Sequence, residues 1–323
     1  MNLSQTILGV TFPNPTVLAS GIMGITASSW KYVAEHGAGG ITTKSLWPME
    51  HEGNRNPTII STPFWTLNAV GVPDAGPEKA KEEITAYMKD KPVPLIANVI
   101  GLRPEEFAEI TEKLVPLKPD FFEVNLSTPT FEKLRGKLFA QDANESQTVI
   151  RAVKKVAGGI PVFAKLTPNV DKIGEIAKAV VDAGADGICA INTVGPGMAI
   201  DLRSKMPILA WKKGGLSGPA LKPIAVRCIA ECYEATGGKV PIIGTGGVYT
   251  GEDALELMLA GASLVGVGTS VADRGVQVFK AIRDEMQLWC TNEGIWDIRD
   301  MIGGMHKELL RRSTFSPPGV PSL

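Results

Sequence analysis

Eight short runs of apolar and β-branched residues recur along the chain, and each is followed by a segment with helical spacing of its apolar positions. The runs occupy residues 16–21, 40–45, 94–101, 121–127, 161–167, 187–193, 241–247 and 264–270. Their near-continuous hydrophobicity is typical of parallel strands buried on both faces. Helical periodicity is clear in segments 104–117, 145–156, 172–183, 219–235 and 252–260. This alternation predicts an α/β fold, a closed (β/α)8 TIM barrel.

An open, doubly wound dinucleotide-binding sheet fits the sequence less well. Such a sheet needs a GxGxxG phrase at the start of its first helix, and the first predicted strand-to-helix junction lacks one. No linker or low-complexity stretch divides the chain, so we expect residues 1–323 to form a single domain. Residues from about 291 to 323 are expected to be a C-terminal extension, with an irregular tail at 316–321.

Three connections in the predicted barrel are too long to be simple turns. They span residues 46–76, 128–142 and 194–217. Each follows the carboxyl end of a predicted strand, which is the face where barrel enzymes build their active sites. Long loops at this face usually cover or bind a ligand. The first fifteen residues predict a short β-hairpin outside the barrel, with strands at 3–8 and 10–12.

The composition excludes several classes of protein. Lys and Arg total 33 against 34 Asp and Glu, so the formal net charge is −1 and gives no basis for nucleic-acid or membrane-surface binding. No apolar run approaches the roughly 20 residues that span a bilayer, and the N-terminus lacks a signal-peptide pattern. We therefore expect a cytoplasmic protein.

Cysteine and histidine spacings do not predict a metal site. The four cysteines, Cys189, Cys228, Cys232 and Cys290, include no CxxC pair. Cys228 and Cys232 are one helical turn apart, but no further ligand lies nearby in the sequence. The three histidines form neither HxH nor HExxH spacing. We expect no metal, and no iron–sulfur cluster held by this chain alone.

Glycine phrases end the last two predicted strands. Gly244-Thr245-Gly246-Gly247 closes the seventh and Gly266-Val267-Gly268-Thr269 closes the eighth. Backbone N–H groups of such phrases can approach phosphate oxygens closely, and phosphate sites recur after these two strands in barrels. A third phrase, Gly214-Gly215-Leu216-Ser217-Gly218-Pro219, precedes a predicted helix. The alternative is that these glycines serve only tight turns, but three phrases at the expected corners favour a phosphorylated ligand.

Polar side chains gather at the other strand ends. They are Ser20, Lys44, Asn68, Asn125, Ser127, Lys165, Asn192 and Thr193. Asparagine amides suit a planar ligand that is rich in N–H and C=O groups. A lysine at the barrel mouth is a positive charge that can stabilise an anion developing during a reaction. Lys44 and Lys165 could instead extend to the surface, although both lie within apolar runs.

Several of these phrases, in this order, resemble the class 1 dihydroorotate dehydrogenases. They are Ala19-Ser20-Gly21, Thr43-Lys44-Ser45, Leu67-Asn68-Ala69-Val70-Gly71, Asn125-Leu126-Ser127-Thr128-Pro129, Lys165-Leu166-Thr167-Pro168-Asn169, Asn192-Thr193, Gly215-Leu216-Ser217-Gly218-Pro219 and the two closing glycine phrases. The resemblance runs from about residue 3 to about residue 285. It is greatest to the NAD-linked branch, class 1B, in which the barrel subunit partners a subunit that carries FAD and an iron–sulfur cluster.

The resemblance implies an FMN-dependent oxidation of dihydroorotate to orotate in pyrimidine biosynthesis, and a homodimer of the barrel subunit. FMN would be bound by Ser20, Gly21, Lys44, Ser45, Asn125, Lys165, Gly218, Gly246, Gly247, Gly268 and Thr269. The substrate would be bound by Lys44, Asn68, Asn125, Asn192 and Thr193. Thr128 would remove the C5 proton, while Lys44 would be a catalytic cation.

Two positions depart from the family pattern Asn-x-Ser-Cys-Pro-Asn. Thr128 stands where the base is usually Cys, and Thr130 stands where an Asn usually binds the substrate. A hydroxyl is a far weaker acid than a thiol, so Thr128 needs a relay for its proton, such as Ser127 or an ordered water. Loss of an amide that binds the substrate can lower specificity by orders of magnitude.

Three alternatives therefore stay open. The chain could be a related FMN-dependent reductase or dehydrogenase that acts on another dihydropyrimidine-like substrate. It could be a non-redox barrel, such as an isomerase or lyase of a phosphorylated metabolite, or an inactive partner subunit. A yellow purified protein would distinguish the flavin enzymes from the non-redox barrel, and reduction of the flavin by dihydroorotate would distinguish the two flavin enzymes.

Overall fold

Eight parallel strands close into a barrel in the computed structural model, which describes residues 1–128 and 136–313. The strands are β3 (Thr16–Leu18), β4 (Gly40–Thr42), β7 (Leu95–Val99), β8 (Phe121–Asn125), β9 (Val162–Lys165), β10 (Gly187–Ala190), β15 (Ile242–Thr245) and β16 (Leu264–Val267). They pair in chain order, and β16 returns to pair with β3. The predicted TIM barrel and all eight of its strands are confirmed.

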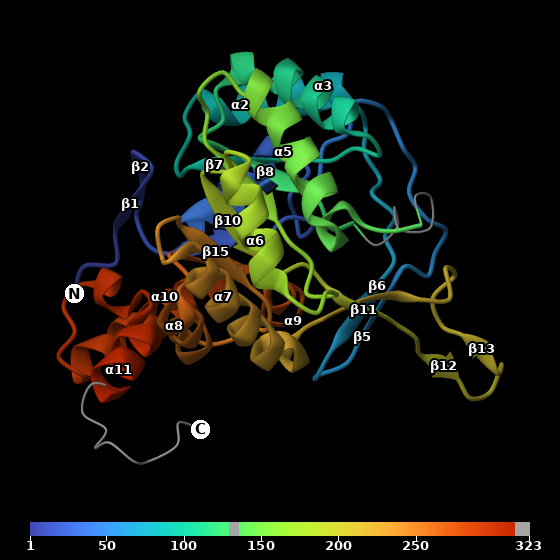
Figure 1. The fold of residues 1–323 in the computed structure, drawn as a ribbon. Coiled ribbons are helices and arrows are strands. Elements are labelled where there is room, and N and C mark those ends of the chain that lie inside the picture. Colours follow the sequence, from blue (N-terminus) through green and yellow to red (C-terminus); the bar gives the residue numbers. More distant parts are fainter. Residues whose placement is uncertain (129–135, 314–323) are drawn as a thin grey trace.

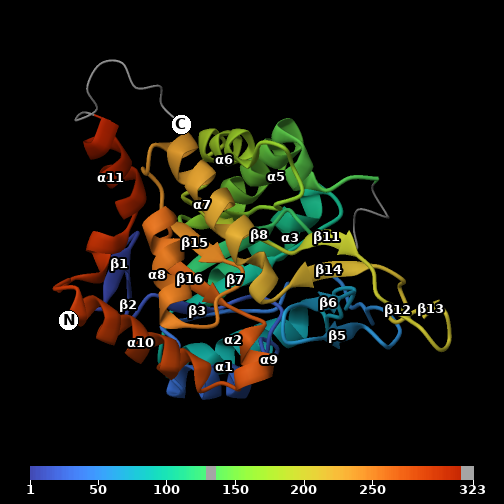
Figure 2. The same cartoon turned by 90° about the horizontal axis from the view of Figure 1, so that it is seen from below.

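Helices surround the strands (Figures 1 and 2). They are α1 (Ala27–Glu35), α2 (Pro77–Met88), α3 (Pro104–Leu114), α5 (Ala143–Val156), α6 (Ile173–Asp182), α7 (Lys222–Thr236), α8 (Gly251–Ala260), α9 (Ser270–Arg274), α10 (Val278–Asn292) and α11 (Gly304–Ser313). The five segments with predicted helical periodicity all contain helix. None of the helices described here is long and apolar enough to cross a bilayer.

The helix starts are fixed by side chains that satisfy free backbone N–H groups. Asp142 precedes α5 and accepts hydrogen bonds from the backbone N–H of Asn144 at 2.9 Å and Glu145 at 3.0 Å. Thr250 and Asp253 form a reciprocal capping box at the start of α8. These caps fix where the chain turns from a strand end into the next helix.

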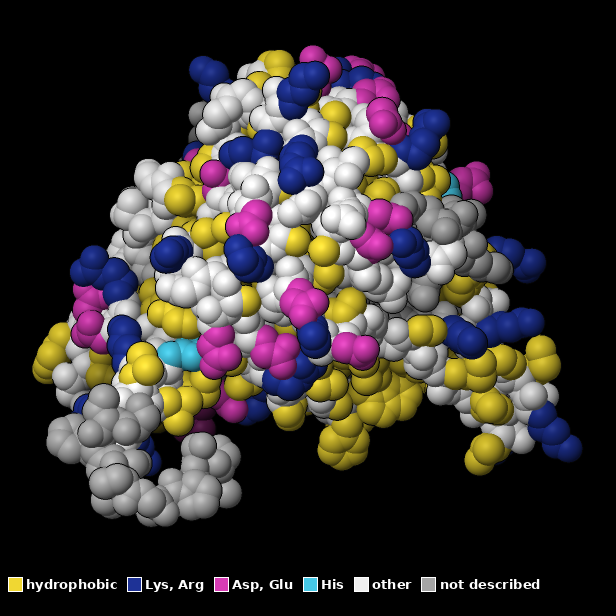
Figure 3. Space-filling view, in the orientation of Figure 1, with side chains coloured by type: hydrophobic (Ala, Val, Ile, Leu, Met, Phe, Trp, Pro, Cys, Tyr) yellow, Lys and Arg dark blue, Asp and Glu magenta, His cyan; other side chains and the backbone are white. Residues whose placement is uncertain are grey.

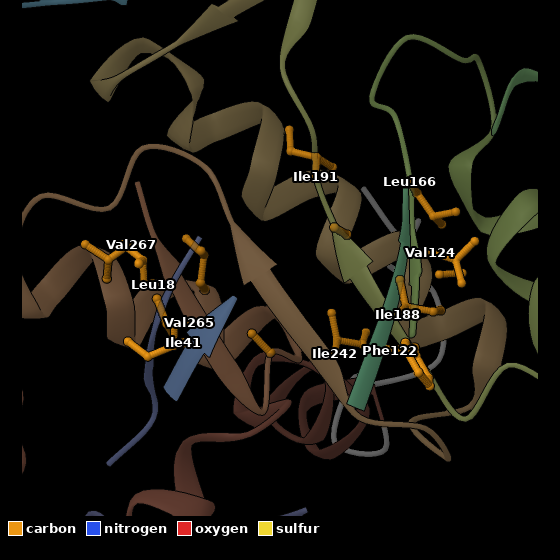
Figure 4. Close-up of a cluster of buried hydrophobic side chains, with 14 of the residues drawn as sticks. Leu18, Ile41, Phe122, Val124, Leu166, Ile188, Ile191, Ile242, Val265 and Val267 are labelled. Atoms are coloured by element: carbon orange, nitrogen blue, oxygen red, sulfur yellow. The ribbon is translucent and has the colours of Figure 1, made fainter. Parts of the chain in front are cut away.

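The two faces of each strand serve different cores. Apolar side chains that face outward pack against the helices, as Figure 4 shows for Leu18, Phe122, Ile188 and Val265. Residues that alternate with them point into the barrel, because successive side chains of a strand lie on opposite faces. Since both faces are buried, the strands show near-continuous hydrophobicity in the sequence.

The predicted N-terminal hairpin is present and lies against the amino-terminal end of the barrel. It consists of β1 (Gln5–Ile7) and β2 (Val10–Phe12), which pair antiparallel. Its last residue, Phe12, is fully buried and its ring centroid lies 5.8 Å from that of Phe121. Phe121 stacks in turn on Phe163, with centroids 4.9 Å apart. These three rings, called the aromatic floor below, fill that end of the barrel interior.

Two of the long connections, which the sequence predicted to be loops, form a sheet. The sheet contains β5 (Ile59–Ser61), β6 (Thr66–Asn68), β11 (Val194–Gly197) and β14 (Gly214–Ser217), in the order β11-β14-β6-β5. We call it the cap sheet. Its neighbouring strands are antiparallel. β14, from connection 194–217, pairs with β6, from connection 46–76. A further hairpin, β12 (Ile200–Asp201) and β13 (Met206–Pro207), projects from it in both ribbon views.

The C-terminal extension packs on the barrel helices. A short 3-10 helix (Ile298–Met301) follows α10, and α11 then packs beside α8 (Figure 2). The His306 ring stacks on Tyr233 of α7 with centroids 4.7 Å apart, and its Nε2 lies 2.9 Å from the carbonyl oxygen of Ala260. The predicted irregular tail at 316–321 lies outside the described residues.

Candidate active site

A cavity of about 840 Å³ lies at the carboxyl ends of the barrel strands, between the barrel and the cap sheet. Every binding or catalytic residue that the sequence predicts lines it. These residues are Ser20, Gly21, Lys44, Ser45, Asn68, Asn125, Thr128, Lys165, Asn192, Thr193, Gly218, Gly246, Gly247, Gly268 and Thr269. Thr130 lies outside the described residues. The size is within the usual range for a small-molecule or cofactor site.

Glycines after β15 and β16 form one end of this cavity. Gly247 has φ +75°, and a Cβ there would lie 2.5 Å from the backbone nitrogen of Lys222, so only glycine fits. At Gly268 an added Cβ would meet no atom nearer than Ala19 Cβ, at 3.5 Å. Thr269 Oγ1 donates a hydrogen bond to Ser217 Oγ at 3.0 Å. Backbone groups therefore come close to the cavity here, as phosphate sites require.

Two asparagine side chains are held in place by hydrogen bonds. Asn192 Nδ2 donates to Ser127 Oγ at 2.8 Å and to the Ser127 carbonyl oxygen at 3.1 Å. Asn125 Nδ2 donates to Ser45 Oγ at 3.2 Å, and its Oδ1 accepts from Ser127 Oγ at 3.3 Å. Ser127, which the sequence places at the mouth, does not line the cavity but braces both amides. The amides are thus oriented before any ligand binds.

Thr128 lines the cavity, and its buried hydroxyl has no hydrogen-bond partner among the described residues. The residue is buried, and burying an unpaired hydroxyl costs free energy. The Ser127 hydroxyl bonds to Asn125 and Asn192 instead, so the proton relay expected through Ser127 is not formed.

Lys165 is buried at the base of the cavity and forms an ion pair. Its Nζ lies 3.2 Å from Glu123 Oε1, and Asn98 Nδ2 donates to the same oxygen. Burial alone would lower the pKa of Lys165, but the Glu123 carboxylate raises it above the ordinary value. Lys165 is therefore a fixed positive charge and not a lysine that extends to the surface.

The sequence analysis missed Glu123 and Asn98. Each is a polar residue within an otherwise apolar strand, and each is almost completely buried. A charged residue in the middle of a buried strand requires a partner, because an unpaired buried charge is very costly. That pattern, an acid two residues before Asn125, could have identified Glu123 as the partner of a buried cation.

Lys44 is the second cation of the cavity, and its environment differs. Its ammonium group forms no hydrogen bond or ion pair with the residues described here. Burial lowers the pKa of Lys44, and the charge of Asp74 opposes part of this change. Burial likewise raises the pKa of Asp74, although hydrogen bonds from the backbone N–H groups of Trp47 and Gly76 favour its charged form. Lys44 is thus available to a ligand.

Comparison with known proteins decides the family. The family model for dihydroorotate dehydrogenase matches residues 2–289. The chain belongs to the dihydroorotate dehydrogenase family. Membership makes it a flavin-dependent oxidoreductase, and the non-redox barrel considered from the sequence is thereby excluded.

Relatives of this dihydroorotate dehydrogenase family member align over most of their length. The dihydroorotate dehydrogenase B (NAD(+)) catalytic subunit of Methanocaldococcus jannaschii is 46% identical over 308 residues, which cover 94% of this chain and 98% of the relative. The subunit of the same name from Pyrococcus horikoshii is 42% identical and covers 93% and 97%. A crystal structure of the Eimeria tenella enzyme with ferulenol matches with a TM-score of 0.83 at 25% identity, covering 95% of this chain and 89% of that one.

The environment of Lys44 gives a testable prediction for the ligand-free protein. We expect Lys44 to titrate at a lower pH than the exposed lysines, because burial disfavours its charged form. Reductive methylation with ¹³C-formaldehyde and an NMR titration would measure this, with the Lys44→Arg variant identifying the resonance. Lys172, whose pKa is raised by a hydrogen bond to Glu175, is the matched exposed control.

In the same titration Asp74→Asn should lower the pKa of Lys44 further, since Asp74 opposes the effect of burial. The assigned environment would be contradicted if the Lys44 resonance titrated at the same pH as the exposed lysines in both the wild-type chain and Asp74→Asn.

Proposed function

We propose that this chain binds FMN and oxidises dihydroorotate to orotate as the catalytic subunit of a larger enzyme. The observation that carries the proposal is that one cavity is lined by four kinds of group. They are the glycines after β15 and β16 (Gly246, Gly247 and Gly268, the glycine cradle), the buried charged Lys165, the oriented asparagine amides, and Thr128, whose hydroxyl has no partner among the described residues. These are the groups needed for a phosphorylated flavin and for a planar substrate that loses a proton and a hydride. The names of the relatives, catalytic subunits of dihydroorotate dehydrogenase B, support the same assignment.

The residues of the cavity fit FMN. Gly246, Gly247 and Gly268 would hold the phosphate with their backbone N–H groups, since they carry no side chain, and Thr269 would add its backbone N–H and hydroxyl. Ser20, Gly21, Ser45 and Gly218 would contact the rest of the cofactor. When bound, the flavin supplies a two-electron acceptor. The Lys165 charge would stabilise the negative charge of its reduced form.

The amides and Thr128 fit the substrate. Asn68, Asn125, Asn192 and Thr193 would pair with the N–H and C=O groups of the dihydropyrimidine ring, and Lys44 would pair with its carboxylate. Thr128 would accept the C5 proton as its own hydroxyl proton passes to an ordered water, while the C6 hydride leaves for the flavin, so that the C5–C6 bond becomes a double bond. The cap sheet closes the cavity on the side opposite the barrel and limits access of water.

Gly268→Val should remove FMN without unfolding the protein. Gly268 lines the cavity, its φ is not positive, and an added Cβ would meet no atom nearer than 3.5 Å, so the larger side chain should occupy cavity space proposed for the phosphate. We expect FMN affinity to fall at least about tenfold, equivalent to about 1.4 kcal/mol, with a smaller loss for Gly268→Ala. Flavin absorbance per polypeptide and the dissociation constant measure the loss, and thermal melting checks the fold. A fully yellow Gly268→Val protein would place the phosphate elsewhere.

Thr128→Val should slow reduction of the flavin by dihydroorotate about 10²-fold or more, the usual scale for loss of a general base. Valine keeps the shape and removes the proton acceptor, whereas Thr128→Ser should retain most of the rate. The measurement is anaerobic, single-turnover stopped flow. Thr111→Val is the control, since Thr111 is a buried threonine of α3 whose hydroxyl only donates to the Phe107 carbonyl.

Two outcomes of this experiment would change the assignment. A wild-type rate in Thr128→Val would mean that another group is the base. If dihydroorotate leaves the flavin of the unmodified protein oxidised while another dihydropyrimidine reduces it, the chain is the related oxidoreductase with a different substrate. The Thr128 hydroxyl, in place of the usual thiol, is the observation that favours this second candidate.

Electrons are proposed to leave through another subunit, as the names of the NAD-linked relatives indicate. The β12–β13 hairpin has three exposed apolar residues, Ile200, Leu202 and Met206, which offer a surface for a protein partner. Figure 3 shows apolar side chains at the lower right, where Figure 1 labels this hairpin. Co-purification from the native source should yield a flavin or iron–sulfur subunit, together with a homodimer of this chain.

The Leu202→Glu/Met206→Glu variant should lower the mass of this assembly and its reduction of NAD⁺, while dihydroorotate still reduces the flavin. Leu288→Glu, at an exposed leucine of α10, is the control. Light scattering gives the mass. Efficient reduction of NAD⁺ by this chain alone would refute the partner.

A further inference from the structure

A layer of polar side chains lies inside the barrel between the aromatic floor and the cavity. On β8 the inward residues are Phe121, Glu123 and Asn125, and on β9 they are Phe163 and Lys165, because inward positions alternate along each strand. Phe121 and Phe163 belong to the floor, and Asn125 and Lys165 line the cavity. Glu123 occupies the level between them. It does not line the cavity, and the proposed reaction does not use it.

The contacts of Glu123 are to the interior of the barrel and to Lys165. Its side chain is 2% exposed, and its Oε1 accepts hydrogen bonds from Lys165 Nζ at 3.2 Å and from Asn98 Nδ2. Asn98 is held in turn, since its backbone N–H donates to Thr43 Oγ1 at 3.0 Å. The carboxylate therefore lies behind Lys165, on the side away from a ligand in the cavity.

A lysine buried to this degree without an anion would lose its proton at neutral pH. The titratable groups that act on Lys165 are Glu123 from β8 and Cys189 from β10, and Lys44 lines the same cavity. Burial, followed by the charge of Glu123, raises the pKa of the Cys189 thiol well above its ordinary value, so this thiol stays neutral. Glu123 is thus the anion that balances Lys165.

We propose that Glu123 is a positioning residue that keeps Lys165 charged and fixed at the base of the cavity, and thereby sets how the reduction potential of the bound flavin depends on pH. The second half of this proposal rests on the proposed FMN site. The first half concerns the protein without its cofactor, so the two can be tested separately.

The first test uses the flavin-free protein and compares Glu123→Gln with Glu123→Gln/Lys165→Met. In Glu123→Gln the pKa of Lys165 falls below its ordinary value of about 10.4, because burial is then unopposed. A lysine with a lowered folded-state pKa destabilises the protein at neutral pH, and this penalty decreases as pH rises toward the unfolded-state pKa. Urea unfolding from pH 7 to 10 should therefore show Glu123→Gln gaining stability relative to the double variant.

The second test measures the reduction potential of the flavin-loaded protein against pH. In the unmodified protein, uptake of one proton with two electrons gives a slope of about 30 mV per pH unit, since a tenfold change in a two-electron equilibrium is about 30 mV. In Glu123→Gln a neutral Lys165 should take up a second proton when the flavin is reduced, which doubles the slope to about 59 mV. Glu123→Gln/Lys165→Met should return to about 30 mV.

Glu106→Gln is the matched control for both tests. Glu106 is also a buried glutamate, but it accepts from Trp47 Nε1 and the Leu102 backbone outside the cavity. Glu106→Gln should leave the slope of the reduction potential against pH unchanged.

The outcomes separate the two proposals. An unchanged slope in Glu123→Gln, with no gain in stability toward high pH relative to the double variant, would show that Glu123 only packs and would overturn the inference. If no flavin binds, the proposed function fails while the stability comparison still decides the role of Glu123. If Glu123→Gln does not fold but the double variant does, the unpaired lysine is the cause and the inference stands. If neither folds, the inference is overturned.

Discussion

The closed barrel must fill its interior with side chains, and the rest of the molecule follows from how this chain does so. Parallel strands place alternate residues inside, and at the amino-terminal end those residues are large and aromatic. Phe12 of the hairpin completes this floor, so that aromatic rings fill the barrel interior at that end. Beyond this floor the interior holds the polar side chains of Glu123 and Asn98, and at the carboxyl ends the strands open to the cap sheet. The cavity therefore lies where the packing of the barrel stops.

The same constraint explains why the two lysines of the cavity differ. Lys165 points into the barrel, where a charge survives only beside a carboxylate, and Glu123 provides it from the neighbouring strand. Lys44 follows the end of β4 and has no such partner among the described residues, so burial weakens its charged form. One cation is permanent and suits a cofactor that becomes negative. The other responds to the ligand that enters, because a bound carboxylate would favour its charged form.

Sequence alone could predict the barrel because strands that are buried on both faces have near-continuous apolar sequences. It could also predict the members of the cavity, since carboxyl ends of parallel strands converge whatever the loops do. The cap sheet was not predicted because β11 is Val194-Gly195-Pro196-Gly197, which has no alternation and only one β-branched residue, and because β14 and β6 pair although they are far apart in the chain. Glu123 was not predicted because it is a single polar residue inside an otherwise apolar run. Its partner sits on another strand, which only the register between β8 and β9 reveals.

The structure also shows why a change at Thr128 need not disturb the cofactor site. The glycine cradle belongs to β15 and β16 and is supported by the start of α7, whereas Thr128 belongs to the segment after β8. The amides beside Thr128 are braced by Ser127, not by the Thr128 side chain, so their orientation does not depend on which residue occupies position 128. The proposed proton acceptor and the proposed phosphate-binding glycines are thus carried by separate elements. Under the proposed function, replacement of a thiol by a hydroxyl at this one position would alter the proton transfer while the same cavity, cations and cradle remain.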